Sequence, residues 1–406
     1  MADPTRKLRP LELARWQIER DQERMRRMPA LLARKRARMT ASPFAFLRGS
    51  APLFYRILRN VPRLARGPED EGLLCGDLHL ENFGVYRPDR PSRGGDRVAF
   101  DLDDLDQAFV GHLHLDVLRV LTSVLLAARG WGCTTDGALE LAWALLDGYR
   151  RVRASGRLPP APAPVSALLA QVAARKRRAF LDRYTRVVGH HRRFKLGDTL
   201  RPLPRTVRAA CARAFTRFGR QEMEQGGQSA ERFRVLDLAF RVAGTGSLGT
   251  FRVAVLVEGH GARDSAWLFD MKAMGEPAGS ALATEAPEPG PERVVQALRT
   301  LLREPPAMLG TARVLGQGLL IRRLTPQDDR LDWATLPAEQ RAPTLAFLGA
   351  LSGAAHRRGA RGKLPPLEQS DARRLQRAAV ELAGFHEAVA LAYAAETGDA
   401  GAARRA

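Results

Sequence analysis

The residues best suited to chemistry lie close together between positions 75 and 106. Asp77 is followed five residues later by Asn82, and two further carboxylates, Asp101 and Asp103, stand at the end of an apolar run. Phosphoryl transfer needs a carboxylate at the incoming hydroxyl, together with an amide and a carboxylate that hold magnesium against the phosphates. We therefore predict that Asp77 acts on an acceptor hydroxyl. Asn82 and either Asp101 or Asp103 would then bind Mg²⁺. An acidic surface turn is the alternative interpretation of Asp77 and Asn82 taken alone.

A glycine-rich turn much further along the chain suits a nucleotide phosphate. It contains Gly244, Gly246, Ser247 and Gly249 and separates two β-like runs. Glycines in this pattern also open dinucleotide-binding helices, so the pattern alone is weak. The residues from 250 to 257 alternate and are rich in Val and Phe, which predicts a strand rather than a helix. We expect the turn to join two antiparallel strands and to cover the triphosphate of ATP.

Lys272 ends another apolar run, and it is one of only six lysines in a chain whose positive charge comes mainly from arginine. A lysine on a strand beside a glycine turn can pair with nucleotide phosphates, and Glu292 at the start of a predicted helix over 292–303 could orient it. The alternatives are a lysine that reaches solvent and a glutamate that interacts only with the helix dipole.

Two resemblances follow from these residues. The spacing of Asp77 and Asn82 is similar to that of a kinase catalytic loop, and Gly76-Asp77-Leu78-His79 resembles the aminoglycoside and choline phosphotransferase branch. That resemblance implies that Asp116, on a helix, braces the backbone of the loop.

Several segments together also resemble the bacterial domain-of-unknown-function 2252 (DUF2252) family, over about residues 30 to 395. They are 42–49, 75–84, 100–106, the Gly244 turn with Lys272, and 292–295. The family is uncharacterised, so it implies nothing about the substrate. We would expect Asn in that family at the position of Asp103, which leaves the choice of metal ligand between Asp101 and Asp103 open.

The order of these parts predicts an unusual fold. We expect an α+β, protein-kinase-like, two-lobed fold that is circularly permuted, with the catalytic-loop half first and the glycine-loop β lobe second. The β-like run 319–324 would be the hinge strand, and 344–358 would be the helix that leads into the catalytic loop. The expected regions are a basic helical region at 1–70, a helical catalytic lobe at 71–232, a β-rich nucleotide lobe at 233–325, and C-terminal helices at 326–406 that complete the helical lobe.

Composition narrows the class of protein. The three cysteines, Cys75, Cys133 and Cys211, are widely spaced and suggest a reducing compartment rather than a disulfide framework or a zinc site. No apolar run is long enough for a membrane helix, so we expect a cytoplasmic protein without membrane insertion. The net charge of +21 would attract polyanions non-specifically. No pattern indicates the acceptor or the oligomeric state.

Two other functions compete with an ATP-dependent phosphotransferase. The first is a catalytically inactive kinase-like scaffold that binds nucleic acid or another polyanion. The second is a metal-dependent phosphoester hydrolase that would use Asp77, His79, Asp101, Asp103 and either His112 or His114 as ligands. The hydrolase leaves the glycine turn and Lys272 without a role.

Overall fold

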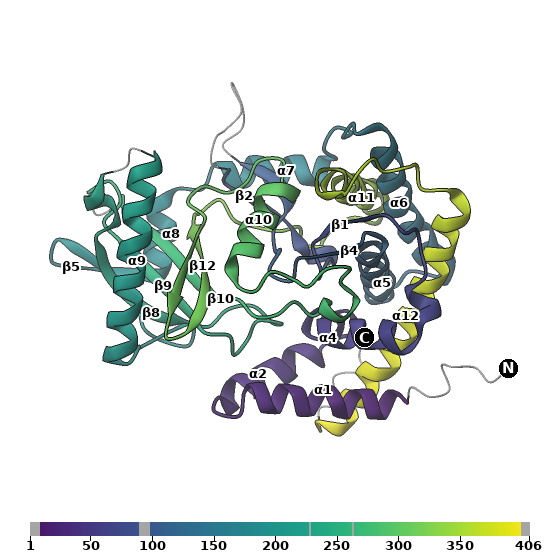
Figure 1. Ribbon diagram of the computed structural model, residues 1–406, viewed down its shortest axis with the longest axis horizontal. Helices are drawn as coiled ribbons and strands as arrows, with labels where there is room; N and C mark the ends of the chain where they lie inside the picture. The colour runs from purple at the N-terminus through teal and green to yellow at the C-terminus, as the bar shows by residue number, and fades with distance from the viewer. Residues whose placement is uncertain (1–8, 89–97, 227–228, 262–263, 399–406) are drawn as a thin grey trace.

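The computed structural model describes residues 9–88, 98–226, 229–261 and 264–398, so the first eight residues of the expected region 1–70 lie outside it. The described residues form an α+β fold in which a six-stranded antiparallel sheet stands beside a group of helices (Figure 1). The sheet has the order β11-β12-β10-β9-β8-β7. Its strands are β7 (Leu200–Arg201), β8 (Val235–Arg241), β9 (Arg252–Val257), β10 (Trp267–Ala273), β11 (Gly310–Val314) and β12 (Gln317–Leu324).

The alternation of Val, Leu and Phe correctly predicts the central strands. The glycine turn joins β8 to β9, which are antiparallel neighbours as expected. The predicted strand 319–324 lies within β12 and pairs with β10, so that Lys272 stands opposite Leu320 on one side and Arg252 on the other.

Both faces of the sheet are covered by segments that precede residue 233. Phe215 and Phe218 of α9 (Arg205–Gly226) pack with Phe269 of β10 on one face. On the other face, Leu181 of α8 (Arg177–Tyr184) packs with Leu268. The unit built on the sheet therefore begins well before 233, the expected boundary, because these helices bury the apolar sides of the strands. The hairpin of β5 (Thr185–Val188) and β6 (His191–Phe194) belongs to the same unit.

The helices form one large core that joins the two ends of the chain. Apolar residues from Leu13 to Tyr393 contribute to it, and the long helices α6 and α11 pack closely against each other. The C-terminal helices thus pack with the helices that follow the loop carrying Asp77 (Figure 1). The main helices here are α4 (Ala51–Asn60), α5 (His114–Gly130), α6 (Thr135–Ser155), α7 (Ala163–Ala173), α11 (Ala338–Gly359) and α12 (Gln369–Glu396).

Two short pairs of strands and several short helices make up the rest of the described fold. Strand β1 (Glu71–Leu74) pairs with β4 (Phe109–His112), and β2 (Phe83–Tyr86) pairs with β3 (Ala99–Leu102). Helix α10 (Pro291–Leu301) lies between β10 and β11 in the chain. At the N-terminus stand α1 (Pro10–Arg24), α2 (Pro29–Met39) and α3 (Pro43–Gly49). Short 3₁₀ turns occupy Pro62–Ala65, Leu80–Asn82, Ala230–Phe233 and Ser280–Leu282.

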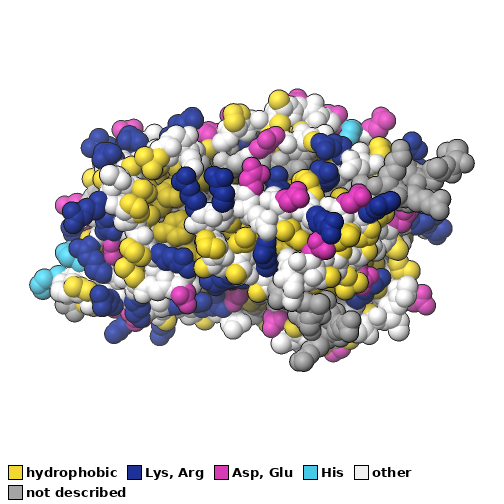
Figure 2. Space-filling view, turned by 90° about the horizontal axis from the view of Figure 1, so that it is seen from below, with side chains coloured by type: hydrophobic (Ala, Val, Ile, Leu, Met, Phe, Trp, Pro, Cys, Tyr) yellow, Lys and Arg dark blue, Asp and Glu magenta, His cyan; other side chains and the backbone are white. Residues whose placement is uncertain are grey.

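None of the helices within the described ranges combines the length and the apolar character that a membrane span requires. On the face shown in Figure 2, basic side chains are spread among acidic and hydrophobic ones rather than gathered into one patch.

Candidate active site

The loop between β1 and β2 is fixed by a buried carboxylate. Asp116, in the first turn of α5, accepts hydrogen bonds from the backbone N–H of Cys75 at 2.7 Å and of Gly76 at 2.9 Å. Its side chain has no exposed surface. This is the bracing that the phosphotransferase resemblance implied. Because an ionised acceptor strengthens such bonds, the loop backbone is held firmly where Asp77 begins.

Gly76 allows this loop to approach the segment after β3. Its φ of +78° falls in the left-handed region, and a Cβ atom there would lie 1.9 Å from the carbonyl oxygen of Gln107. Only glycine fits both conditions. The close approach brings Asp77 next to the acidic segment that ends at Gln107.

Asp77 itself is held by an arginine. The Nε of Arg119, a residue of α5 with no exposed side-chain surface, donates to Oδ1 of Asp77 at 2.6 Å, while 21% of the Asp77 side chain remains exposed. Burial raises the pKa of Asp77 to about 6, although the charge of Arg119 opposes the shift and that of Asp104 adds to it. A carboxylate that is oriented, partly exposed and of raised pKa can accept a proton from a hydroxyl.

Asn82 lies at the other end of the same loop. Its Nδ2 donates to the backbone oxygen of Asp77 at 2.6 Å, and its own backbone oxygen accepts from the N–H of Asp103. Because the amide nitrogen faces Asp77, Oδ1 is the atom left to bind a cation. The structure therefore brings Asp77 and Asn82 together, as predicted.

The two carboxylates proposed as metal ligands are occupied by protein groups. Asp101, buried in β3, accepts from its neighbour Leu102 and from the backbone N–H of Arg303 at 3.2 Å. Asp103 forms ion pairs of 2.8 Å with both Arg322 and Arg330. These arginines outweigh burial and hold the pKa of Asp103 below its usual range. Neither carboxylate contacts Lys272.

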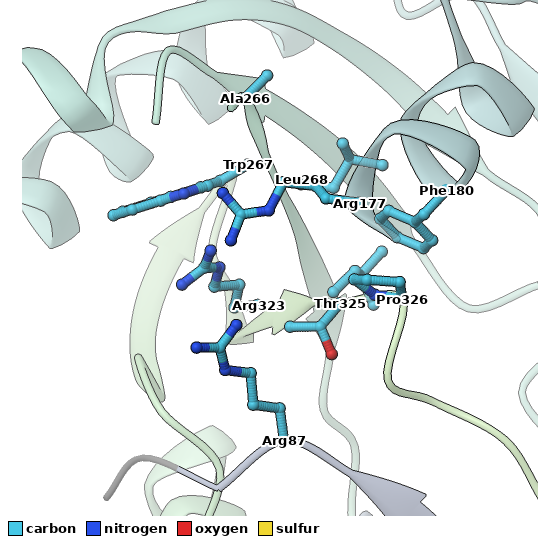
Figure 3. Close-up of a pocket in the computed structure, with 10 residues that line it drawn as sticks. Arg87, Arg177, Phe180, Ala266, Trp267, Leu268, Arg323, Thr325 and Pro326 are labelled. Atoms are coloured by element: carbon cyan, nitrogen blue, oxygen red, sulfur yellow. The ribbon is translucent and has the colours of Figure 1, made fainter. Parts of the chain in front are cut away.

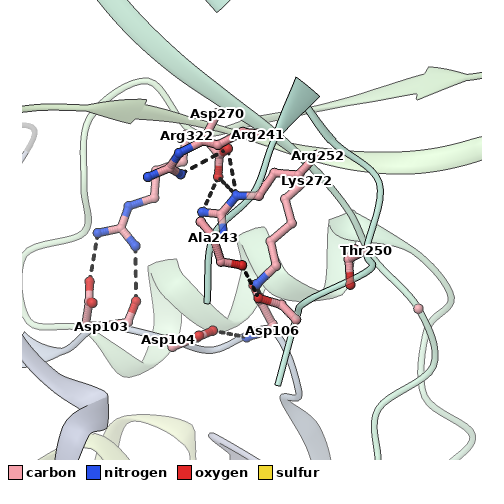
Figure 4. A network of polar contacts seen from close by, with 12 residues as sticks. Asp103, Asp104, Asp106, Arg241, Ala243, Thr250, Arg252, Asp270, Lys272 and Arg322 are labelled. Atoms are coloured by element: carbon pink, nitrogen blue, oxygen red, sulfur yellow. Dashed lines mark hydrogen bonds and ion pairs between the residues drawn. The ribbon is translucent and has the colours of Figure 1, made fainter. Parts of the chain in front are cut away.

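The partner of Lys272 is Asp106, which lies 166 residues earlier in the chain. Figure 4 shows the lysine reaching from β10 to the segment after β3, where the two side chains form an ion pair. Both are largely buried, with 12% and 15% of their side chains exposed. Burial lowers the pKa of Lys272, and the nearby charge of Asp104 opposes that shift. Asp104 is thus within electrostatic reach of both Lys272 and Asp77.

Glu292, the carboxylate that could have oriented Lys272, is not its partner in the structure, because Lys272 pairs with Asp106. Glu292 is exposed at the start of α10, beside Gly290. The next residue, Arg293, is buried instead and donates to the backbone oxygens of Asp106, Ala108 and Gly275. Helix α10 therefore contacts the acidic segment through Arg293, and the carboxylate that pairs with Lys272 is Asp106.

The glycine turn lies at the same end of the sheet as Lys272. Gly244 and Gly249 have φ of +81° and +83°, and the turn is covered by the N-terminal helices. Arg38 of α2 donates to the oxygen of Gly244, and Met25 packs against Gly249. Gly246 lies against the backbone oxygen of Arg48, whose side chain pairs at 2.6 Å with Glu81 in the loop between β1 and β2. Helix α3 therefore connects the glycine turn to the loop that carries Asp77.

Comparison with protein families now places the chain. A family described as an uncharacterized protein conserved in bacteria matches residues 27–399. The chain belongs to the DUF2252 family. Comparison with curated proteins and with solved structures gave no match. The match includes Asp77, Asn82, Lys272 and the glycine turn, and the family description assigns none of them a role.

In this DUF2252 protein, the three histidines that the hydrolase alternative would use contact backbone groups of the fold. Both ring nitrogens of His114 contact backbone oxygens, at 2.7 Å from Ala65 and 2.9 Å from Pro68. His112 contacts the oxygen of Glu69, and Nδ1 of His79 accepts from the N–H of Glu81. Within the described ranges, no three or more His, Cys, Asp or Glu side chains gather to hold a metal. These contacts give the hydrolase alternative no support.

The predictions from sequence give no role to Asp104 or Asp106. A signal was present, because residues 101–106 contain four Asp in a run of six. Strand β3 ends at Leu102, so Asp101 is still inside it and only the later carboxylates enter the loop that faces Lys272.

Proposed function

We propose that this DUF2252 protein is an ATP-dependent phosphotransferase that moves a phosphoryl group to a hydroxyl acceptor. One observation carries the proposal. Lys272, from the centre of the sheet, meets Asp106 beside the braced loop of Asp77 and Asn82. Such a convergence of a lysine, carboxylates and an amide from distant segments is what phosphoryl transfer requires, since catalysis there is mostly positioning and charge neutralisation.

In this proposal Lys272 binds the phosphates of ATP and Asp106 orients the lysine. The ion pair holds the ammonium of Lys272 beside the segment after β3, at the end of the sheet where the glycine turn lies, before nucleotide arrives. Arg252 stands opposite Lys272 in the register, but its guanidinium is bound to Asp270 at 2.6 Å and 2.8 Å. Of these two neighbouring cations, Lys272 is therefore the one whose side chain is directed to the acidic loop (Figure 4).

We propose Asn82 and Asp104 as the residues that hold Mg²⁺. Oxygen donors of the amide and carboxylate type suit this hard cation, which dehydrates reluctantly and commonly takes one or two protein carboxylates. Asp104 fits better than Asp101 or Asp103. Both oxygens of Asp101 accept backbone N–H groups and Asp103 pairs with two arginines, whereas Asp104 accepts the N–H of Asp106 through Oδ1 at 3.3 Å. Bound magnesium would neutralise phosphate charge.

Asp77 would accept the hydrogen of the acceptor hydroxyl. Its raised pKa of about 6 leaves it ionised above that pH, and the bond from Arg119 fixes the direction of the carboxylate. A base with a pKa close to the working pH is effective in proton transfer.

The same residues underlie our inference of a kinase-like, permuted arrangement. The braced loop precedes the sheet in the chain, whereas Lys272 and the glycine turn come later. The polyanion-binding alternative draws on the net charge of +21, but that charge is dispersed on the face in Figure 2. No observation favours it over phosphoryl transfer.

The first test is ATP affinity with and without Mg²⁺, measured by calorimetry. Lys272→Met should weaken Mg-ATP binding by roughly 10- to 150-fold, the equivalent of one hydrogen bond to a charged group. Lys363→Met, at an exposed position, removes the same charge and should have little effect. Absence of Mg-dependent ATP binding in the wild type, or equal binding by the Lys272 variant, would rule out the proposal.

The second test separates binding from transfer. Asp77→Asn should keep Mg-ATP affinity within a few-fold and lose turnover, measured as ATP hydrolysis and in a screen of hydroxyl acceptors. Asp104→Asn should instead reduce the Mg-dependent part of ATP binding, whereas Asp371→Asn on the exposed start of α12 should not. Turnover near the wild-type rate in Asp77→Asn would remove this residue from the mechanism.

A further inference from the structure

A small hollow lies at one end of the sheet, where β10 begins and β12 ends. Three arginines from separate parts of the chain line it: Arg87 after β2, Arg177 at the start of α8, and Arg323 near the end of β12. Figure 3 shows their guanidinium groups directed toward the same space, with Trp267 on one side and Thr325 on another.

The three cations have no acidic partner in the part of the chain that the structure describes. No ion pair joins Arg87, Arg177 or Arg323 to a carboxylate there. Five other arginines around the sheet each have one: Arg192, Arg208, Arg234, Arg252 and Arg322. Like charges so close together repel one another. Burial first, and then the charges of Arg177 and Arg87, lower the pKa of Arg323. The described residues therefore leave the charge of this cluster uncompensated.

Two buried N–H donors of residues that line the hollow also lack acceptors within the described residues. Within the described residues, neither Nε of Arg323 nor Nε1 of Trp267 has a hydrogen-bond partner, and both atoms are buried. The guanidinium of Arg323 stacks over the indole ring, 4.1 Å from its centre. Unsatisfied buried donors are uncommon in native structures and call for an explanation such as a bound ion.

The start of α8 adds to the positive field. This helix begins at Arg177, and its N-cap residue, Lys176, makes no side-chain capping bond. The N-terminal end of a helix carries partial positive charge and free N–H groups, so an arginine there is unfavourable unless an anion is bound nearby.

We propose that this hollow is a binding site for a phosphate group. Arginine forks match phosphate oxygens with paired hydrogen bonds, and three of them converge here with two orphaned donors. The enclosed part of the hollow measures about 10 Å³, roughly the space of one water molecule, so a phosphate group would lie at the open side of the hollow, among the arginine side chains. Such a site suits a compact phosphate or the phosphate end of an ester rather than a whole nucleotide.

The site is separate from the residues proposed for phosphoryl transfer. Trp267 begins the seven-residue strand β10 and Lys272 lies near its end. At about 3.3 Å per residue, the strand places roughly 16 Å between them. The proposal therefore does not depend on the proposed enzymatic function.

The test is titration of the full-length protein with inorganic phosphate and, in a second arm, with glycerol 3-phosphate, at constant ionic strength. Calorimetry gives the affinity, and tryptophan fluorescence reports on Trp267, with Trp267→Phe identifying its share of the signal. Arg323→Gln and Arg177→Gln should each weaken phosphate binding about tenfold or more, because each removes a charged donor. Arg313→Gln, an exposed position on β11 with the same loss of charge, should change the affinity less than about twofold.

Stability provides a check that is independent of affinity. Without phosphate, Arg323→Gln should unfold at the same or a higher temperature than the wild type, because it relieves unpaired charge. With phosphate, only proteins that retain the site should gain Tm. Tighter binding of glycerol 3-phosphate would indicate a phosphate ester as the natural ligand, and tighter binding of inorganic phosphate would indicate the free ion. Equal phosphate affinity in the wild type and both arginine variants would overturn the proposal, as would loss of binding in Lys272→Met.

Discussion

Replacing Asp116 by Ala tests whether the loop of the candidate active site depends on a single buried carboxylate. The carboxylate accepts the N–H groups of Cys75 and Gly76 at 2.7 Å and 2.9 Å. Its Oδ2 also lies 3.3 Å from Nε2 of His356. Alanine removes all these acceptors from a position with no solvent exposure. The backbone donors would then be left without partners.

The expected loss of stability follows from counting these donors. Each buried N–H that loses its acceptor costs about 1–3 kcal/mol. Two such groups give a loss of roughly 2–6 kcal/mol, toward the lower end if water enters the space left by the carboxylate. That is a large fraction of the stability of a typical folded protein, about 5–15 kcal/mol.

The measurement is urea denaturation followed by circular dichroism, with the change in the midpoint converted through a common slope. Asp371→Ala serves as the control, because Asp371 also lies in the first turn of a helix but 27% of its side chain is exposed and its partner, Arg374, is a surface group. Surface ion pairs contribute about 0–1 kcal/mol. If Asp116→Ala destabilises the protein no more than Asp371→Ala does, the carboxylate does not brace the loop.

Two further predictions concern the same loop. Turnover of ATP should fall as the pH drops through about 6, because burial raises the pKa of Asp77 to about 6 and its protonated form cannot accept a proton; a rate unchanged down to pH 5 would exclude it as the base. The contribution of Asp77 to folding stability changes with pH in the opposite direction. Its pKa is raised in the folded state, so ionisation between about pH 4 and 6 lowers the free energy of unfolding as the pH rises. Gly76→Ala should destabilise the protein more than Gly189→Ala in thermal unfolding. Both glycines have positive φ, but only Gly76 has a backbone oxygen where Cβ would lie. Equal shifts in Tm would show that the approach to Gln107 is not tight.

Local sequence patterns determined much of this protein. The alternating apolar runs gave the antiparallel strands β8, β9 and β10, because period-2 alternation suits a sheet with two different faces. The glycine turn was placed correctly between two of them. The spacing of Asp77 and Asn82 predicted a shared loop, and the resemblance placed Asp116 against its backbone. Contacts within a few residues, or within one motif, follow from backbone periodicity and turn chemistry.

Only the tertiary structure decided which charges meet. Lys272 pairs with Asp106 rather than Glu292, because α10 turns Arg293 inward and leaves Glu292 exposed. Asp103 belongs to the same acidic run as Asp106, yet it pairs with Arg322 and Arg330, which lie more than 200 residues later in the chain. These ion pairs depend on how the sheet packs against the helical core. The residues next to a carboxylate in an acidic run do not indicate which distant cation it will contact. The convergence of Arg87, Arg177 and Arg323 has the same origin, since each comes from a different element and the fold alone brings them to one hollow.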